Sequence, residues 1–321
     1  MKNFQNKDFT LGIIGGGQLG RMLIQSGIDI NVKMSVMDAD PNAPCKSLIS
    51  DFFVGSLLDK HSVVNFGKNC DVITYEIEHI NVDGLFELEK MGKKVYPSAK
   101  ILEIVQDKGL QKQFYIDNNI PTAPFELVNN LDELRSKDLK LPVVQKTRKG
   151  GYDGNGVNIL RTTEDIKTTF DSPSLLEDMI PFEKEIAVIV SRNPSGDIKT
   201  FPAVEMVFHP TANLVDYLFS PAEINDSITK KANNIAVSLA EKLNLVGILA
   251  VEMFVTKEGE ILVNEIAPRP HNSGHQTIEG NYTSQYAQHL RAILNLPLGS
   301  TETIIPTVNM VYVTLNNLYF L

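Results

Sequence analysis

Short apolar strands alternate with helical segments through the first third of the chain, and this alternation restricts its fold more than any other feature. Leu11-Gly12-Ile13-Ile14 has the character of a buried strand, and the glycine turn 15–20 then opens a helix. Further strands are expected over 32–37 and over Asp71-Val72-Ile73-Thr74-Tyr75. Strands separated by helices are typical of parallel sheets. We therefore predict an α/β chain that begins with a Rossmann-like domain.

Strands predominate in the next part of the chain, after a helical pair expected over residues 98–118. Strand signals over 121–190 indicate a small second lobe. An amphipathic stretch, 220–243, predicts a long helix because its apolar side chains recur at helical spacing. Two apolar strands, 248–255 and 261–266, are joined by a short glycine-containing turn, which predicts a hairpin in a third, larger lobe.

Composition excludes several classes of function. The formal net charge of -9 argues against binding to nucleic acid or to an acidic membrane, since phosphates require a basic surface. The only cysteines, Cys45 and Cys70, form no CxxC pair, and the N-terminus resembles no signal peptide, so we expect a cytoplasmic protein. Residues 303–321 are uncharged, but Pro306 and several asparagines interrupt them. We expect a strand over 308–315 there, not a membrane span.

Gly15, Gly17 and Gly20 have the spacing G-x-G-x-x-G between a strand and a helix. Three interpretations stay open: a nicotinamide or flavin site, a phosphorylated substrate lying over the turn, and a tight turn that merely needs glycine. In the first two, backbone amides would hold an anionic group. Ligands of open α/β sheets lie at the carboxyl ends of the strands, so we expect Gln18 and Glu76 to converge on one crevice.

A second glycine-rich segment, Lys146 to Gly156, lies between two expected strands. Its four glycines suit a lid whose amides close over triphosphate oxygens, while Lys146 meets the inner phosphates. Tyr152 and Asp153 at its apex are polar groups that a simple turn would not need together. The alternative is a solvent-exposed β-hairpin.

Two glutamates, Glu252 and Glu265, interrupt the last two apolar strands. A buried carboxylate is costly unless it is paired or binds a metal, and the hairpin can set these two side by side. Adjacent carboxylates repel, so a cation between them is expected, and oxygen ligands beside a phosphate loop favour Mg²⁺. The alternative is a pair of solvent-facing acids on an edge strand.

The segment Ala267-Pro268-Arg269-Pro270-His271-Asn272-Ser273-Gly274-His275 follows directly. Arg269 can bind a planar carbonate or carboxylate through two parallel hydrogen bonds. His271 and His275 are either functional or structural histidines.

A lysine before a glycine lid, a hinge acid and two strand carboxylates together resemble the ATP-grasp superfamily. Within it, residues 15–22, 150–154 and 264–275 resemble the N5-carboxyaminoimidazole ribonucleotide synthetase family, ATP-dependent carboxylases of purine biosynthesis. The resemblance extends from about Leu11 to Thr307. It implies four parts: a Rossmann-like substrate domain (1–97), a small α+β lobe with the lid (98–190), a larger α+β lobe with the metal site (191–300) and an incomplete C-terminal module (301–321).

The resemblance also implies roles for individual residues. The expected nucleotide contacts are Lys108, Lys146, Gly151, Tyr152, Asp153, Gly154, Asn155, Gly156, Val157, Glu177, Asp178, Met179, Ile180, Glu185, Glu205, Asn264 and Glu265. The expected substrate contacts are Gln18, Glu76, Arg269, His271 and Asn272, with Glu78 as a substitute for Glu76. Tyr152, Asp153, Arg269 and His271 are the expected catalytic residues, and Glu252 and Glu265 the magnesium ligands.

The implied reaction begins when bicarbonate attacks the γ-phosphate of ATP, giving carboxyphosphate and ADP. Carboxyphosphate, or the CO₂ that it releases, then meets the amine of 5-aminoimidazole ribonucleotide. The partners are therefore small molecules, and the resemblance implies a homodimer. Two alternatives stay open: a ligase that uses another carboxylate, such as formate, and a non-catalytic ATP-binding homologue.

The chain departs from the family pattern in two places. Asn155 occupies a lid position that is usually basic, and Lys149 is a possible substitute. Family members also continue into a C-terminal module with a basic motif that binds the 5′-phosphate of the substrate, whereas this sequence ends at Leu321. From this we expect weaker ribonucleotide binding and lower stability, with ATP binding retained.

Overall fold

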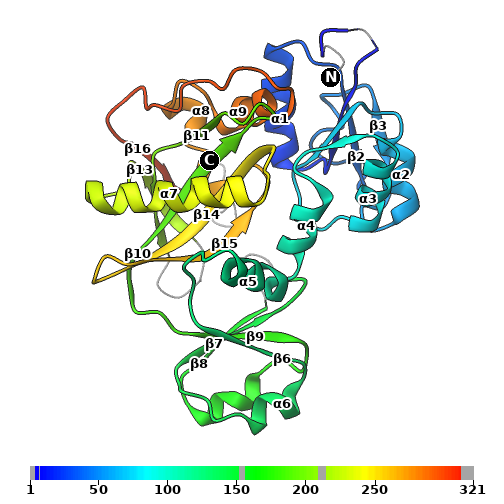
Figure 1. Cartoon of the computed structure of the whole chain (residues 1–321). Helices are drawn as coiled ribbons and strands as arrows, with labels where there is room; N and C mark the ends of the chain where they lie inside the picture. Colours follow the sequence, from blue (N-terminus) through cyan, green and yellow to red (C-terminus); the bar gives the residue numbers. More distant parts are fainter. Residues whose placement is uncertain (1–3, 7, 152–155, 209–214, 312–321) are drawn as a thin grey trace, which may run out of the picture.

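The computed structural model describes residues 4–6, 8–151, 156–208 and 215–311. Within these ranges the chain forms three sheets. Figure 1 shows them as an N-terminal domain and a larger lobe side by side, with a small lobe below. Each sheet buries its own apolar cluster. The α/β architecture predicted from the alternating strands and helices is confirmed.

The N-terminal domain is a parallel sheet of five strands in the order β3-β2-β1-β4-β5. Its strands are β1 (Leu11–Ile14), β2 (Met34–Asp38), β3 (Phe52–Val54), β4 (Val72–Tyr75) and β5 (Lys94–Val95). Its helices are α1 (Gln18–Asp29), α2 (Lys60–Gly67) and α3 (Val82–Lys90). The central strand β1 is fully buried and pairs with β2 and β4, so the turns after β1 and β4 lie side by side at one edge of the sheet.

Two helices, α4 (Ala99–Gln106) and α5 (Lys108–Asp117), connect this domain to the rest of the chain. They confirm the helical pair expected over 98–118. The side chain of Asp107 caps α5, because it accepts hydrogen bonds from the amides of Gly109 and Leu110. Tyr115 on α5 packs into the core of the larger lobe.

The small lobe is an antiparallel sheet in the order β6-β9-β7-β8 with one helix. Its elements are β6 (Phe125–Val128), α6 (Leu131–Ser136), β7 (Val143–Thr147), β8 (Val157–Leu160) and β9 (Ser174–Asp178). Val128, Leu134 and Leu176 form its core. Figure 1 shows this lobe at the bottom of the molecule, below α5.

The larger lobe is a seven-stranded sheet whose long strands β10 and β14 lie side by side at its centre. Its strands are β10 (Phe182–Arg192), β11 (Ile198–Thr200), β12 (Val204–Phe208), β13 (Val215–Ser220), β14 (Gly247–Thr256), β15 (Ile261–Ala267) and β16 (Val308–Val311). Helix α7 (Asp226–Lys242) packs on one face, and α9 (Gln285–Ile293), preceded by the short α8 (Thr277–Gly280), packs on part of the other. Helix α9 also packs against the core of β1 and β2, so it joins the two domains.

Two sequence expectations need correction, and a third is confirmed in part. The long helix begins at Asp226 and not at Ser220, because Ser220 ends strand β13 and the side chain of Asn225 caps the helix. The expected lobe boundary at residue 190 falls within β10, which belongs to the larger sheet, so by sheet membership the small lobe ends near Asp178. The strand expected over 308–315 is β16 as far as Val311, and the remainder lies outside the described residues.

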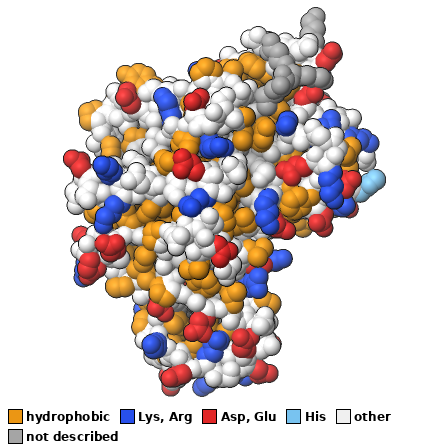
Figure 2. Space-filling model, viewed as in Figure 1, with side chains coloured by type: hydrophobic (Ala, Val, Ile, Leu, Met, Phe, Trp, Pro, Cys, Tyr) orange, Lys and Arg blue, Asp and Glu red, His pale blue; other side chains and the backbone are white. Residues whose placement is uncertain are grey.

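None of the helices among the described residues is both long and apolar enough to cross a membrane. On the face of the molecule seen in Figure 2, acidic and basic side chains are interspersed. The described residues on that face form no extended basic patch that could bind a polyanion, as expected from the net charge of -9.

Candidate functional site

Three carboxylates share one face of the larger sheet. Glu252 on β14 lies directly opposite Glu265 on β15 and opposite Ala187 on β10. Residues that face each other across a ladder point to the same side of a sheet, and so do residues two apart along a strand. Glu185, two residues before Ala187, therefore joins the two glutamates. The structure brings together the two acids that the sequence selected as metal ligands.

A β-bulge separates Asn264 from this regular pairing. Glu252 faces Glu265, but the next residue, Met253, faces Val263, so Asn264 is an extra residue in β15. A bulge breaks the two-residue alternation of side chains. Val263 consequently packs into the core beside α7, while Asn264 and Glu265 both take part in polar contacts of the site.

Two lysines reach this face from other elements. Lys108, the first residue of α5, forms an ion pair with Glu265, and it lowers the pKa of Glu265 to about 2. Lys146, in β7 of the small lobe, donates to the side chain of Asn264 at 2.9 Å and pairs with Glu177 at 2.5 Å. Cations from helix α5 and from the small lobe therefore lie beside the acid pair, where they can neutralise phosphate oxygens.

The donor set of the acid pair suits Mg²⁺. Burial raises the pKa of Glu252 well above its usual range, and the neighbouring charge of Glu265 raises it further. A divalent cation between the two carboxylates would remove this repulsion. Among the described residues no group of three or more His, Cys, Asp or Glu side chains could hold a metal alone. Two carboxylates completed by phosphate oxygens are a usual Mg²⁺ environment in nucleotide sites.

The lid is tied to the start of α5. The guanidinium of Arg148 binds both carboxylate oxygens of Asp107, at 2.9 and 2.8 Å. The backbone amide of Lys108 donates to the carbonyl of Arg148 at 2.9 Å. Of the expected lid residues, the structure describes Gly151, Gly156 and Val157, whereas Tyr152, Asp153, Gly154 and Asn155 lie outside the described residues.

The expected hinge, Glu177 to Ile180, connects β9 of the small lobe to β10 of the larger one. The amide of Asp178 donates to the carbonyl of Pro124, and the carbonyl of Ile180 accepts from Phe182. The carboxylate of Glu177 does not contact a nucleotide base, because it lies buried between Lys146 and Lys112. The side chain of Glu177 is therefore not available to a base.

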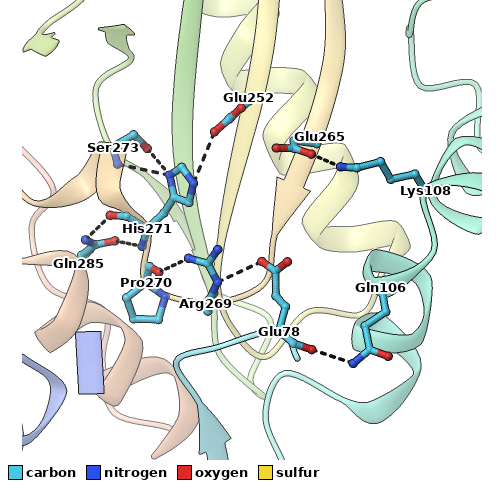
Figure 3. Close-up of polar contacts among 10 residues, drawn as sticks. All are labelled: Glu78, Gln106, Lys108, Glu252, Glu265, Arg269, Pro270, His271, Ser273 and Gln285. Atoms are coloured by element: carbon cyan, nitrogen blue, oxygen red, sulfur yellow. Dashed lines mark hydrogen bonds and ion pairs between the residues drawn. The ribbon is translucent and has the colours of Figure 1, made fainter. Parts of the chain in front are cut away.

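Arg269 and His271 are held at the end of β15 nearest the N-terminal domain, as Figure 3 shows. Nε of Arg269 pairs with Glu78 at 3.0 Å, and one terminal nitrogen donates to the carbonyl of Pro270. Gln106 donates to the carbonyls of Glu78 and Ile80, both at 2.7 Å, and so fixes the backbone that carries Glu78. Glu78 therefore orients the arginine.

His271 has a defined tautomer. Its Nδ1 accepts a hydrogen bond from the backbone amide of Ser273 at 3.3 Å, so the proton of the neutral ring resides on Nε2. Nε2 lies 3.4 Å from a carboxylate oxygen of Glu252. Burial lowers the pKa of His271 to about 3, and Arg269 contributes in the same direction. Gln285 on α9 fixes the backbone of His271 through two hydrogen bonds, at 2.9 and 2.7 Å.

The first glycine turn binds carboxylates of the chain itself. The amide of Gly16 donates to Asp38 at 2.6 Å, and that of Gly17 donates to Glu76 at 2.9 Å. The expectation that these amides hold an external anion is therefore wrong for both. Glu76 nevertheless lies against the turn that precedes the exposed Gln18, and its charge interacts with Arg269, which links the N-terminal crevice to the larger sheet.

Several expected residues lie apart from this group. Glu205 is paired with Ile186, the neighbour of Glu185, so its side chain projects from the face of the sheet opposite to that of Glu185. There both of its carboxylate oxygens bind Lys184. Asn272 is exposed in a short turn after His271. The imidazole of His275 accepts or donates a 2.8 Å hydrogen bond with the hydroxyl of Tyr286, which favours its structural interpretation.

Sequence reasoning missed the residues that support the selected ones. They are Asp107, Lys112, Arg148, Ser273 and Gln285. One signal was available. Lys112 follows Lys108 by one helical turn, and this spacing predicts that both lysines lie on the same face of the helix. The others act through contacts between distant segments, for which the sequence carries no local pattern.

Two family models match the chain. Residues 113–286 match the ATP-grasp domain, and residues 9–106 match the ribonucleotide synthetase preATP-grasp domain. The two matches together cover the acid pair and every strand described above except β16.

Curated relatives and solved structures agree with these models. The chain is 39% identical to a chloroplastic phosphoribosylaminoimidazole carboxylase of Vigna aconitifolia, over 94% of this chain and 55% of the relative. It is 38% identical to the N5-carboxyaminoimidazole ribonucleotide synthase of Bacillus subtilis, over 92% of this chain and 79% of the relative. The chain thus spans little more than half the length of the first of these.

Among crystal structures, the N5-carboxyaminoimidazole ribonucleotide synthetase of Thermotoga maritima is 43% identical, with a TM-score of 0.86 over 94% of this chain and 80% of that one. The Aspergillus clavatus synthase, crystallised with ADP and 5-aminoimidazole ribonucleotide, is 33% identical, with a TM-score of 0.84 over 92% of this chain and 78% of that one.

Proposed function

Because this chain belongs to the N5-carboxyaminoimidazole ribonucleotide synthetase family of ATP-grasp enzymes, we propose that it carboxylates 5-aminoimidazole ribonucleotide with ATP and bicarbonate. The products would be N5-carboxyaminoimidazole ribonucleotide, ADP and phosphate. The observation that supports this most directly is the register of Glu252 with Glu265, beside lysines from helix α5 and from the small lobe and next to Arg269 and His271.

The acid pair and the lysines would activate bicarbonate. Glu252 and Glu265 would hold Mg²⁺, which when bound supplies charge neutralisation at the ATP phosphates. Lys146 would contact the inner phosphates from the small lobe. Bicarbonate would attack the γ-phosphorus, and the bond to the bridging oxygen would break, so that carboxyphosphate and ADP form. Lys108 would compensate for the negative charge of Glu265.

Arg269 and His271 would act on the carbonate-derived group. Glu78 holds Nε of Arg269 and Pro270 accepts from one terminal nitrogen, so the other terminal nitrogen would bind a carboxylate oxygen, and Nε2–H of His271 is a neutral donor beside it. The amine of the ribonucleotide would then attack the carbonyl carbon of carboxyphosphate, and phosphate would leave and take up the proton of the amine. If carboxyphosphate first breaks into CO₂ and phosphate, the amine would attack the CO₂ and give its proton to that phosphate. Gln18 and Glu76 would hold the ribonucleotide at the edge of the N-terminal sheet. Closure of the lid would exclude water, which destroys carboxyphosphate.

An ADP-release assay tests this function. ADP should form in the presence of Mg²⁺, bicarbonate and 5-aminoimidazole ribonucleotide, and its rate should fall to background when the ribonucleotide is omitted. Formate in place of bicarbonate should not support turnover; if it does, the chain is a formate-using ligase. ATP binding without any ribonucleotide-dependent ADP release would identify a non-catalytic nucleotide-binding protein instead.

Assembly and location are part of the same proposal. A homodimer follows from the family resemblance, and light scattering in solution would test it. A cytoplasmic location is supported by the two free, buried thiols of Cys45 and Cys70, which suit a reducing compartment.

A further inference from the structure

Lys112 is a buried cation to which the mechanism above assigns no task. Its residue is 2% exposed, and it lies on α5 one turn after Lys108. A buried ammonium group is costly unless it is paired and hydrogen-bonded. Lys112 satisfies this condition with two partners, the carboxylate of Glu177 and the hydroxyl of Thr122.

Glu177 is shared between two lysines. One carboxylate oxygen binds Lys112 and the other binds Lys146, the latter at 2.5 Å. The residue is 4% exposed, so water screens these charges weakly. The three groups together carry one net positive charge. Without Lys112, Glu177 and Lys146 would form a neutral pair, and the carboxylate would compete with phosphate oxygens for the ammonium group of Lys146.

The surroundings keep the three groups in place. Thr122, which accepts from Lys112, donates in turn to the carbonyl of Val263 at 2.8 Å, next to Asn264. Lys146 donates to Asn264 itself. The cluster therefore ties α5, the end of β9 and the bulge of β15 to one another.

The charges depend on one another. Burial raises the pKa of Glu177, but Lys146 and Lys112 outweigh it, and the pKa is lowered overall. Burial also lowers the pKa of Lys112, and the charge of Glu177 opposes this without reversing it. The two lysines thus hold Glu177 in its charged form.

We infer that Lys112 is a positioning residue, which takes up the charge of Glu177 and so leaves Lys146 with a net positive charge for the phosphates of ATP. The inference rests on the proposed function, because it takes ATP as the ligand of Lys146. It predicts that Lys112 affects nucleotide affinity without touching the nucleotide.

The test compares Lys112→Met, Glu177→Gln and the double variant in binding of Mg·ATP, measured by titration calorimetry without ribonucleotide. Lys112→Met should weaken binding about tenfold or more, because Lys146 is then neutralised by Glu177. The double variant removes the competing carboxylate as well, so its affinity should return to within about threefold of the unchanged protein. Lys100→Met, an exposed lysine on α4 paired with Glu103, is the matched control and should bind normally.

A purely structural role gives a different pattern. In that case Lys112→Met would lower the melting temperature but leave the affinity for Mg·ATP unchanged, or the double variant would bind no better than Lys112→Met; either result overturns the inference. If Lys112→Met does not fold, Lys112→Arg and the double variant decide, since both must then bind Mg·ATP. Ribonucleotide-dependent ADP release in the unchanged protein is measured separately, so failure of the proposed carboxylation does not imitate failure of this inference.

Discussion

Acidification should destabilise the protein through His289, and the size of this effect follows from its surroundings. The ring lies on α9 with no exposed surface, and its Nε2 forms a 2.7 Å hydrogen bond with the hydroxyl of Thr74 on β4. Burial lowers the pKa of His289 from its ordinary value of 6.5 to about 3. The ring is therefore neutral in the folded protein at a pH at which it takes up a proton in the unfolded chain.

The direction and magnitude follow from this difference in proton binding. The contribution of His289 to the unfolding free energy is fully present above the unfolded pKa of 6.5. It is lost as the pH drops, because the unfolded state then binds one more proton than the folded state. The slope approaches about 1.4 kcal/mol per pH unit. Between pH 7.5 and pH 5.0 the contribution of this one ring amounts to about 2 kcal/mol of unfolding free energy.

Urea unfolding of the unchanged protein and of His289→Gln, at several pH values between 7.5 and 5.0, measures this contribution. Glutamine can still bond to Thr74 but does not titrate. His271 and His275, whose pKa values burial also lowers, remain in both proteins and cancel in the comparison. The difference in stability between the two proteins should therefore shrink by about 2 kcal/mol on acidification. A difference that stays constant with pH would refute the reasoning.

Three further predictions concern the site. Glu265→Gln should lower kcat/KM for Mg·ATP about 100-fold or more, with a weaker dependence on Mg²⁺ concentration; an unchanged Mg²⁺ titration would contradict the metal assignment. Glu78→Gln should loosen Arg269 and raise the KM for bicarbonate about tenfold while leaving Mg·ATP binding intact, so a loss of ATP binding would count against it. Asp107→Ala removes the cap of α5 and the partner of Arg148, and should cost about 1–3 kcal/mol in urea unfolding; an unchanged midpoint would argue against this role.

The sequence was sufficient for the parts of the site that follow from regular spacing. Glu252 and Glu265 interrupt apolar strands on either side of a short turn, and a hairpin of that length brings them into register. Lys146 stands directly before a glycine-rich segment that connects two strands, and the structure places it beside the acid pair. These inferences needed only the geometry of strands and hairpins.

Other features depended on contacts between distant segments, which no local pattern reveals. The G-x-G-x-x-G spacing does not disclose that the amides of Gly16 and Gly17 bind Asp38 and Glu76. The helix start at Asp226 was misplaced because the residues before it, although compatible with a helix, pair in strand β13. The side of the sheet that Glu205 occupies is likewise set by the pairing of β12 with β10, which cannot be predicted from the sequence alone.

The extra residue in β15 has a bearing on how such a site could arise. If Asn264 were deleted, Val263 and Glu265 would become neighbours in an uninterrupted ladder, and Glu265 would still face Glu252. The strand without Asn264 would therefore keep its two acids but lose the side-chain amide that contacts Lys146. The insertion of one residue in a hairpin is thus enough to add a side-chain contact to a lysine of the small lobe without disturbing the pairing of the two acids.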